Sequence, residues 1–235
     1  MTGVQTCALP ILQSWKDIFP KKGEIHFAGA LENNEDTGTL QYLASTAMEA
    51  GFSTRVLDMQ ALDLQNGRFF DPAGELVNRC FKLYPWEWMV DESPDGCLAE
   101  MEWLEPIWKL VMSNKAILAT LYELFPDSPY VLPCYLSRPR SGLFCKKPVF
   151  SREGHNVSVV DIRDWEEYVR IAETEGDYNT GAYVYQEYAE PTAYSGRYPV
   201  IGSWIIGGEA AGIGIRENRM EVTDNLSEFV PHIIG

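Results

Sequence analysis

The strongest chemical signal in this sequence is the segment that runs from Cys145 to Val157 and reads CKKPVFSREGHNV. A strand that ends in basic residues leads into a loop with Ser151, Arg152 and Gly154, and a second apolar strand then begins. Such a loop can direct backbone N–H groups and cationic side chains at a polyphosphate. The same residues also fit an exposed hairpin, because Lys-Pro followed by Gly is common in turns. Taken alone, the segment leaves both interpretations open.

The elements expected near the N-terminus form a βαβ unit. Residues 24–30 are an apolar run typical of a buried strand, and residues 37–50 carry apolar side chains at helical spacing. Gly51 fits the C-terminal cap of that helix, and residues 53–59 predict a second strand. Because a strand, a helix and a strand follow one another, we expect parallel pairing in this part of the chain.

The remainder of the chain changes in character near residue 128. Before that point the pattern predicts a hairpin at 66–74, a strand at 77–83, and helices at 99–112 and 115–125. After it, short strands are expected at 130–136, 142–149, 157–161, 183–188, 200–206 and 211–216, with one helix at 164–175. We therefore predict an α/β half followed by an α+β half that is rich in antiparallel strands.

Composition excludes several classes of protein. The formal net charge is −15, whereas phosphate contacts to nucleic acid need clustered Lys and Arg, so we expect no nucleic-acid partner. The acidic balance fits a cationic substrate, and it equally fits a protein that is acidic for solubility alone. The most apolar stretch, residues 198–215, is interrupted by five glycines and Glu209, so no membrane partner is expected.

The cysteines indicate a reducing compartment. They are Cys7, Cys80, Cys97, Cys134 and Cys145. Their spacing gives no CxxC pair and no zinc pattern with histidine. An odd, scattered set is typical of reduced thiols, and we therefore expect a cytoplasmic protein.

Short segments in a fixed order resemble the ATP-grasp part of the glutathionylspermidine synthase family. They are FKLYPWEWM, Asn114-Lys115, LYELFP, KPVFSREGHNV, YVYQEY, YPVIGSWIIGGEAAGIGIRE and SEFVPHII. The resemblance extends from about residue 24 to the C-terminus, and FKLYPWEWM is most like bacterial members of unassigned substrate. It implies a pre-ATP-grasp-like βαβ portion followed by an ATP-grasp portion with antiparallel strands. The implied activity is carbon–nitrogen ligation, in which ATP converts a carboxylate to an acyl phosphate that an amine attacks, with ATP and Mg²⁺ as cofactors.

The resemblance also implies eight ATP-binding positions. They are two phosphate-neutralising lysines (Lys115, Lys147), a mobile loop over the triphosphate (Arg152, Gly154), a segment that holds adenine (Gln186, Glu187, Tyr188) and a cation that lines the cleft (Arg216). Each residue also has a plain structural interpretation. Lys115 fits a solvated lysine at the start of a helix, and Gln186 fits an ordinary polar strand residue.

The implied substrate residues are an acidic pair. Glu35 and Asp36 match carboxylates that meet the polyamine in the synthase, which suits an ammonium group. They equally fit a turn and a helix N-cap, where Asp is favoured. Leu83 and Trp88 stand where the synthase has threonines that contact glutathione. Because apolar groups replace hydroxyls there, we expect a different carboxylate substrate.

The boundaries expected from the sequence give three portions. Residues 2–11 (TGVQTCALPI) resemble a translated sequencing adapter, so we expect residues 1–11 to be an artefact. Residues 12–127 are then the pre-ATP-grasp-like portion with linking helices, and residues 128–235 the nucleotide-binding portion. The family's metal carboxylates, metal Asn, catalytic Arg and any amidase domain lie upstream of the segments matched here.

We therefore expect a fragment that is inactive alone and that holds no catalytic or metal-binding residue of its own. Asp224 and Asn225 are interpreted as structural rather than as metal ligands. Two alternatives remain at this level, a non-catalytic nucleotide-binding or interaction module and a plain structural α/β domain.

Overall fold

The computed structural model describes residues 4–164, 167–178, 181–222 and 227–233. The chain divides into two compact units, of which unit 1 comprises Met1–Leu110 and Ser203–Gly212 and unit 2 comprises Val111–Gly202 and Ile213–Gly235. Asp224 and Asn225 lie outside the described residues. The sequence-based portions with a boundary at 127 and 128 stay a prediction. No helix in the described ranges is long and apolar enough to cross a membrane.

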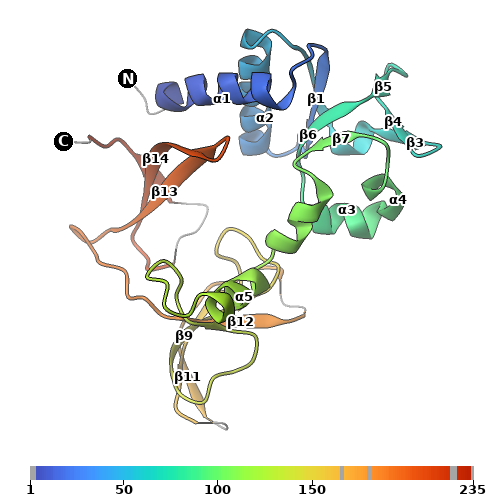
Figure 1. The fold of residues 1–235 in the computed structure, drawn as a ribbon. Coiled ribbons are helices and arrows are strands. Elements are labelled where there is room, and N and C mark those ends of the chain that lie inside the picture. Colours follow the sequence, from blue (N-terminus) through green and yellow to red (C-terminus); the bar gives the residue numbers. More distant parts are fainter. Residues whose placement is uncertain (1–3, 165–166, 179–180, 223–226, 234–235) are drawn as a thin grey trace. The chain divides into compact units, whose positions relative to one another are not determined.

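Unit 1 is built on a four-stranded sheet with the order β2-β1-β6-β7 (Figure 1). Its strands are β1 (Glu24–Gly29), β2 (Ser53–Asp58), β6 (Arg79–Leu83) and β7 (Glu102–Leu104). All neighbouring pairs in it are parallel. Helix α2 (Asn34–Glu49) connects β1 to β2, and Gly51 follows it with a positive φ of 94°. The predicted βαβ unit and its glycine cap are therefore confirmed.

Helices α1 (Val4–Ile18) and α2 pack together on one face of this sheet (Figure 1). Trp15 of α1 lies against Phe27 of β1, with ring centroids 5.6 Å apart in an edge-to-face arrangement. The indole Nε1 of Trp15 donates a hydrogen bond of 2.9 Å to Thr46 Oγ1 of α2. Because these side chains are buried, the hydrogen bond both satisfies the indole and fixes α1 against α2.

The other face of the sheet is covered by short elements. They are the 3-10 helix η1 (Met59–Ala61), the strands β3 (Asp63–Gln65), β4 (Arg68–Phe70) and β5 (Leu76–Val77), and the helices α3 (Trp86–Glu92) and α4 (Pro94–Cys97). Phe69, Trp86 and Trp103 form the centre of this second cluster. The β3–β4 hairpin turns at Asn66 and Gly67, which both have positive φ, so the hairpin predicted there is confirmed.

The helix predicted at 99–112 is wrong. The structure instead has strand β7, followed after Pro106 by a 3-10 helix, η2 (Ile107–Met112). Strand β7 adds to the parallel sheet beside β6, and Trp103 is buried against the second cluster. Trp103 thus gains burial in an extended conformation, and Pro106 interrupts any continuous helix.

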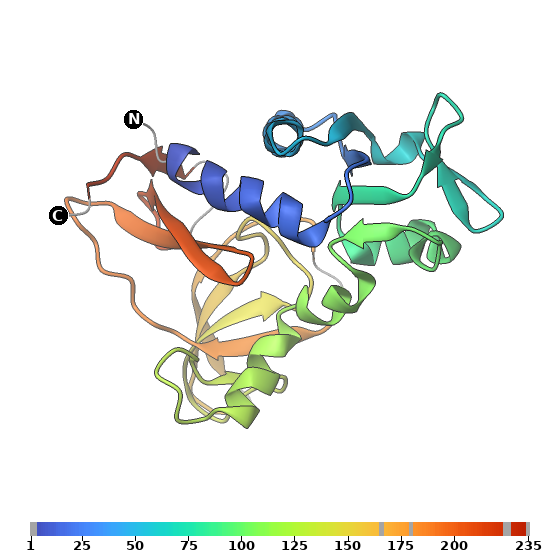
Figure 2. The same cartoon turned by 45° about the horizontal axis from the view of Figure 1, so that its top comes forward.

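Unit 2 contains a five-stranded antiparallel sheet with the order β11-β10-β9-β12-β8 (Figure 2). Its strands are β8 (Cys134–Tyr135), β9 (Gly142–Pro148), β10 (Ser158–Ile162), β11 (Tyr168–Glu173) and β12 (Tyr183–Glu187). Helix α5 (Ala116–Leu124) packs against β8 and β12. A second sheet contains β13 (Tyr198–Ile206), β14 (Glu209–Asn218) and β15 (Glu228–Val230). The predicted change to antiparallel strands is confirmed.

The helix predicted at 164–175 is also wrong, since residues 168–173 form strand β11. Strand β11 pairs antiparallel with β10, with Tyr168 opposite Ile162 and Glu173 opposite Ser158. Tyr168, Val169 and Ile171 are residue types that favour strands. The backbone of β10 offers this segment a hydrogen-bonding partner that a local pattern cannot reveal.

Candidate functional site

Lys147 and Gln186 meet on one face of the five-stranded sheet. Lys147 Nζ, near the end of β9, donates a hydrogen bond of 2.7 Å to Gln186 Oε1 on β12. In the antiparallel register Lys147 lies opposite Val184, and Cys145 lies opposite Gln186. Because side chains alternate along a strand, these four residues share a face. Among the described residues no carboxylate lies within 4.0 Å of the Lys147 ammonium, so its charge is available to a phosphate oxygen.

Lys115 lies where α5 begins and contacts the chain just after β9. Its backbone N–H donates to the carbonyl of Val149 at 2.9 Å. Its Nζ donates to the carbonyl of Ser151 at 2.5 Å and to Ser151 Oγ at 2.9 Å. Since Ser151 is only four residues beyond Lys147, both lysines lie near the start of the loop that follows β9.

The loop at 151–156 is held at both ends, at Ser151 by Lys115 and at Gly154 and Asn156 by residues further along the chain. Gly154 adopts a positive φ of 73°, and its carbonyl accepts a hydrogen bond from the hydroxyl of Thr174. Asn156 Oδ1 accepts the backbone N–H of Tyr178 at 2.7 Å. Arg152, at the start of the loop, has an exposed side chain. The backbone turn is therefore fixed while the cationic side chain stays in contact with solvent.

The segment from Gln186 to Tyr188 ends β12 with its N–H groups engaged. The N–H of Glu187 donates to Pro133 O at 2.7 Å, and that of Tyr188 donates to Leu143 O at 3.1 Å. Tyr188 Oη donates to Glu221 Oε2 at 2.6 Å, and burial together with this carboxylate raises the pKa of Tyr188. What the segment can still offer a ligand is mainly acceptor oxygens, which suit an exocyclic amino group.

Two cysteines that the sequence did not single out flank Gln186. Gln186 pairs with Cys134 on β8 and with Cys145 on β9, so both thiols share its face of the sheet. Burial raises the pKa of each thiol, and both therefore act as small apolar groups near neutral pH. Alternation along β9 could have placed Cys145 beside Lys147, but Cys134 required knowledge of the strand pairing.

Arg216 lies on β14 of the three-stranded sheet, in the part of that strand that belongs to unit 2. It is opposite Phe229 of β15, and its guanidinium carbon lies 5.7 Å from the centre of that ring. In the part of the chain that the structure describes, no hydrogen bond or ion pair joins Arg216 to Lys115, Lys147 or Gln186. The structure thus brings Lys147 and Gln186 together but gives no direct contact for Arg216.

Glu35 and Asp36 lie in the first turn of α2, just beyond the carboxyl end of β1. The N-cap is Asn33, whose Oδ1 accepts the backbone N–H groups of Glu35 at 2.8 Å and Asp36 at 3.4 Å. The interpretation of the acidic pair as the cap itself is therefore wrong. Ligands of open parallel sheets bind beyond the carboxyl ends of the strands, which is where this pair lies. Both residues belong to unit 1, and the predicted ATP residues belong to unit 2.

Leu83 and Trp88 differ in their surroundings. Leu83 is half-buried and packs against the core cluster that contains Phe27. Trp88 is 41% exposed, and its ring lies edge-to-face on Tyr84 with centroids 5.4 Å apart. Only Trp88 therefore presents a large apolar surface beyond the carboxyl end of β6.

Lys82 is a buried cation that sequence reasoning missed. It is 5% exposed, donates from Nζ to the carbonyl of Tyr84 at 2.8 Å, and lies 3.9 Å from the centre of the Trp86 ring. Burial lowers the pKa of Lys82 to about 8. The hydrogen bond joins Lys82 to the residue that directly follows the end of β6. The sequence shows that Lys82 precedes an aromatic segment, but it does not show that the side chain is buried.

The described residues contain no group of three or more His, Cys, Asp or Glu that could hold a metal ion. Two cations do lie at the same end of β9, since Lys147 has a neutral hydrogen-bonding partner and Lys115 contacts Ser151. Such positive charge can attract an anionic group.

Comparison with known proteins adds independent findings. The family model described as glutathionylspermidine synthase preATP-grasp matches residues 7–235. A Haemophilus influenzae protein with the provisional name acid–amine ligase is 34% identical over 221 residues, which cover 90% of this chain and 56% of that protein. Trypanothione synthetase of Crithidia fasciculata is 28% identical, covering 88% of this chain and 35% of its own length. The bifunctional glutathionylspermidine synthetase/amidase of Escherichia coli is 26% identical, covering 85% and 36%.

This chain thus spans about half of the Haemophilus protein and about a third of the other two relatives. Among solved structures, a protein of Methylobacillus flagellatus provisionally named γ-glutamylcysteine synthetase matches with a TM-score of 0.63 at 10% identity. That match covers 95% of this chain and 69% of the other. At such low identity the likeness shows a shared fold.

Proposed function

This chain belongs to the glutathionylspermidine synthase preATP-grasp family, and from that premise we propose that it is part of an ATP-dependent ligase that joins a small carboxylate to an amine. The named relatives are ligases and synthetases, which supports the reaction class. The observation that carries the proposal in this chain is the Lys147–Gln186 pair. A cation held by a neutral amide keeps its full charge for an anionic ligand.

The proposed chemistry has two steps. A carboxylate oxygen of the acid attacks the γ-phosphorus of ATP, which gives an acyl phosphate and releases ADP. The amine nitrogen then attacks the acyl carbon, the carbon–oxygen bond to phosphate breaks, and an amide and inorganic phosphate result. Lys147 and Lys115 neutralise phosphate oxygens, and the loop with Arg152 and Gly154 shields the transferring group from water.

The remaining nucleotide contacts are proposed on the same basis. Gln186, Glu187 and Tyr188 hold the adenine amino group by acceptor oxygens, and Arg216 adds positive charge to the cleft. Mg²⁺ would neutralise the transferring phosphoryl group. From the resemblance to the family, we propose that these ligands and the catalytic arginine belong to an upstream part of the parent protein, and that this chain alone does not turn over.

For the substrates we propose an ammonium-bearing amine at Glu35 and Asp36, because two carboxylates lie together beyond the end of β1. For the acid we propose a compound other than glutathione. Leu83 is engaged in the core and has no donor, and Trp88 places a bulky indole where the synthase has a small hydroxyl. The net charge, and the free state of the cysteines whose side chains the structure describes (Cys80, Cys97, Cys134 and Cys145), support a cytoplasmic protein without a nucleic-acid partner.

The test is ADP release by the parent protein that contains this chain. We expect release that requires both a carboxylate and an amine, and loss of that release in Lys147→Met. The isolated chain should bind ATP without releasing ADP. If the parent binds ATP but releases no ADP with any acid and amine pair, the non-catalytic nucleotide-binding module becomes the better description.

A further inference from the structure

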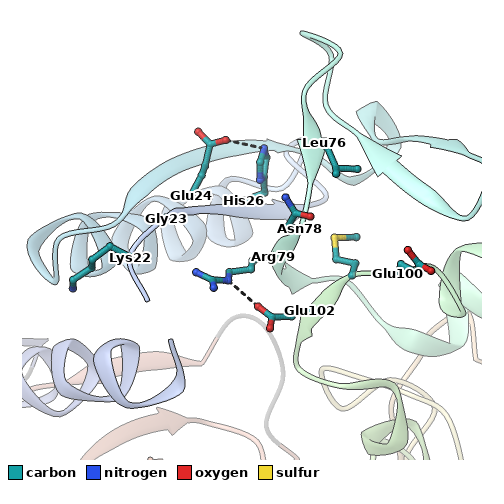
Figure 3. A pocket seen from close by; sticks show the side chains of 10 residues that line it. Lys22, Gly23, Glu24, His26, Leu76, Asn78, Arg79, Glu100 and Glu102 are labelled. Atoms are coloured by element: carbon teal, nitrogen blue, oxygen red, sulfur yellow. Dashed lines mark hydrogen bonds and ion pairs between the residues drawn. The ribbon is translucent and has the colours of Figure 1, made fainter. Parts of the chain in front are cut away.

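A cavity of about 770 Å³ opens at the amino ends of β1, β6 and β7 in unit 1 (Figure 3). Its wall includes Glu24 and His26 of β1, and Asn78 and Arg79 at the start of β6. Glu35 and Asp36 follow the carboxyl end of β1, so the cavity lies at the opposite edge of the sheet. It therefore shares no residue with the site proposed above.

His26 is the most unusual group in this wall. Its side chain is 1% exposed, and neither ring nitrogen has a hydrogen-bond partner among the described residues. Nε2 lies 3.8 Å from Glu24 Oε2 and 3.7 Å from Asp71 Oδ2, which is too far for a direct hydrogen bond. Buried polar atoms in proteins are nearly always satisfied, so this imidazole calls for a partner from outside the chain.

The rest of the wall offers groups of both signs. Arg79 donates from Nε to Glu102 at 2.7 Å and from Nη1 to the carbonyl of Lys21 at 3.0 Å. Its Nη2 and the exposed side-chain amide of Asn78 make no hydrogen bond within the described ranges, and both can donate to an anion. On the adjacent wall, Glu24 gives Oε1 to Arg55 and leaves Oε2 beside His26. Figure 3 shows Glu24 next to His26, and Asn78 and Arg79 below them.

We propose that this cavity binds a free amino acid as a zwitterion. The ammonium lies between Glu24 Oε2 and His26, where two acceptors are close together, and the carboxylate meets Arg79 Nη2 and Asn78. The side chain of the ligand has room beside Leu76 and Met101, which supply apolar surface. A metal ion does not fit this wall, because Arg55 already holds Glu24 and Asp71 and no metal cluster occurs in the described chain.

Charge complementarity favours a zwitterion over ligands that carry only an amine or only a carboxylate. An amine without a carboxylate would satisfy Glu24 and His26 but would lie near the Arg79 guanidinium. A carboxylate without an amine would satisfy Arg79 and leave His26 without a donor. Only a ligand with both groups uses both walls, and none of the lining residues is among the predicted ATP-binding residues.

The experiment is NMR of protein labelled with ¹⁵N-histidine, in the absence of nucleotide. The chain has three histidines, so His155 and His232 serve as internal controls. The probes are L-leucine, L-glutamate and L-lysine, with isoamylamine and 4-methylpentanoate as the two single-charge halves of leucine. We expect at least one amino acid to shift the ring resonances of His26 and not those of the other two histidines. Each half of leucine should bind with an affinity at least about tenfold lower than that of leucine.

Two variants test the carboxylate end. Arg79→Met and Asn78→Leu should each weaken amino-acid binding, by about tenfold for the arginine. Asn78 is exposed and loses no internal bond, so it keeps the test valid should Arg79→Met fail to fold. Arg163→Met, which removes an exposed arginine whose partners Asp161 and Glu167 lie outside the wall, is the matched control and should bind normally.

The proposal is overturned if no amino acid at about 10 mM moves the His26 signals, since the proposed polar contacts should give at least millimolar affinity. It is equally overturned if isoamylamine or 4-methylpentanoate binds as tightly as leucine. Because nucleotide is absent from these measurements, either failure leaves the proposed ligase function untouched.

Discussion

Lys147 Nζ lies 2.7 Å from Gln186 Oε1, so a cation on β9 is held by a neutral amide on β12 that is 39 residues away in the sequence. The preceding residue, Lys146, takes the other face of the sheet, where its Nζ lies 4.0 Å from the centre of the Tyr183 ring. Two adjacent lysines therefore have different surroundings, although the sequence presents them as a single basic pair.

Lys147→Met should weaken ATP binding by about tenfold or more, because a charge-assisted contact to phosphate is lost. Lys146→Met removes the same charge from the other face and should change the affinity by less than about twofold. Isothermal titration with ATP measures both. Equal losses in the two variants would show that only net charge matters and would contradict a site at Lys147.

Lys115→Met should loosen the loop at 151–156, because both hydrogen bonds from Nζ to Ser151 disappear. We expect backbone amides of this loop to exchange hydrogen about tenfold faster in the variant, while those of β1 in unit 1 stay unchanged. Hydrogen-exchange mass spectrometry measures this. Unchanged exchange in the loop would mean that Thr174 and Asn156 hold it without Lys115.

Lys82 should make stability depend on pH in a direction opposite to that of most lysines. Its folded pKa is about 8, below its value in the unfolded chain, so between about pH 8 and 10.4 the unfolded state binds more protons. Unfolding free energy attributable to Lys82 therefore rises with pH across this range, by an amount on the order of 3 kcal/mol.

Urea unfolding of wild type and Lys82→Met at pH 7.5 and pH 10 measures this contribution. The comparison is needed because burial also raises the pKa of Cys80 to about 12, which lowers stability as pH increases above 9 in both proteins. The unfolding free energy of the wild type, relative to that of Lys82→Met, should increase as pH increases. A difference in unfolding free energy that stays constant between pH 7.5 and pH 10 would contradict a lowered pKa for Lys82.

Asp71→Asn should destabilise the turn between β4 and β5. Asp71 Oδ1 accepts the backbone N–H groups of Ala73 and Glu75, each at 2.9 Å. The hydrogen bond from Glu75 contributes most to holding the pKa of Asp71 below its usual value. A carboxyl with a lowered folded pKa stabilises above its unfolded pKa of about 3.9 and loses that effect as pH falls.

The difference in urea midpoint between wild type and Asp71→Asn should therefore be larger at pH 7 than at pH 3. Asp63→Asn, at an exposed position in β3, is the control and should show little change at either pH. A difference that is the same at pH 7 and at pH 3 would mean that the carboxylate charge is not what stabilises the turn.

Much of the fold could be predicted from local pattern. The run at 24–30, the helix that ends at Gly51 and the strand at 53–59 correspond to β1, α2 and β2, because each signal lies within one element. The helices predicted at 99–112 and 164–175 were wrong, although the apolar spacing of these segments suits a helix. Pairing with β6 and β10, which lie elsewhere in the sequence, made strands of residues 102–104 and 168–173.

The candidate site also has features that the sequence predicted and features that only the structure showed. The sequence alone determined that residues such as Lys147, Arg152 and Gln186 belong to motifs of one family in a fixed order. This was possible because the chemistry of a side chain follows from its residue type. The tertiary structure decided that Lys147 contacts Gln186 while Lys146 contacts Tyr183, and that His26 and Lys82 are buried. The reason is physical: strand register and burial are set by hydrogen bonds and packing between segments far apart in the chain, which no local pattern encodes.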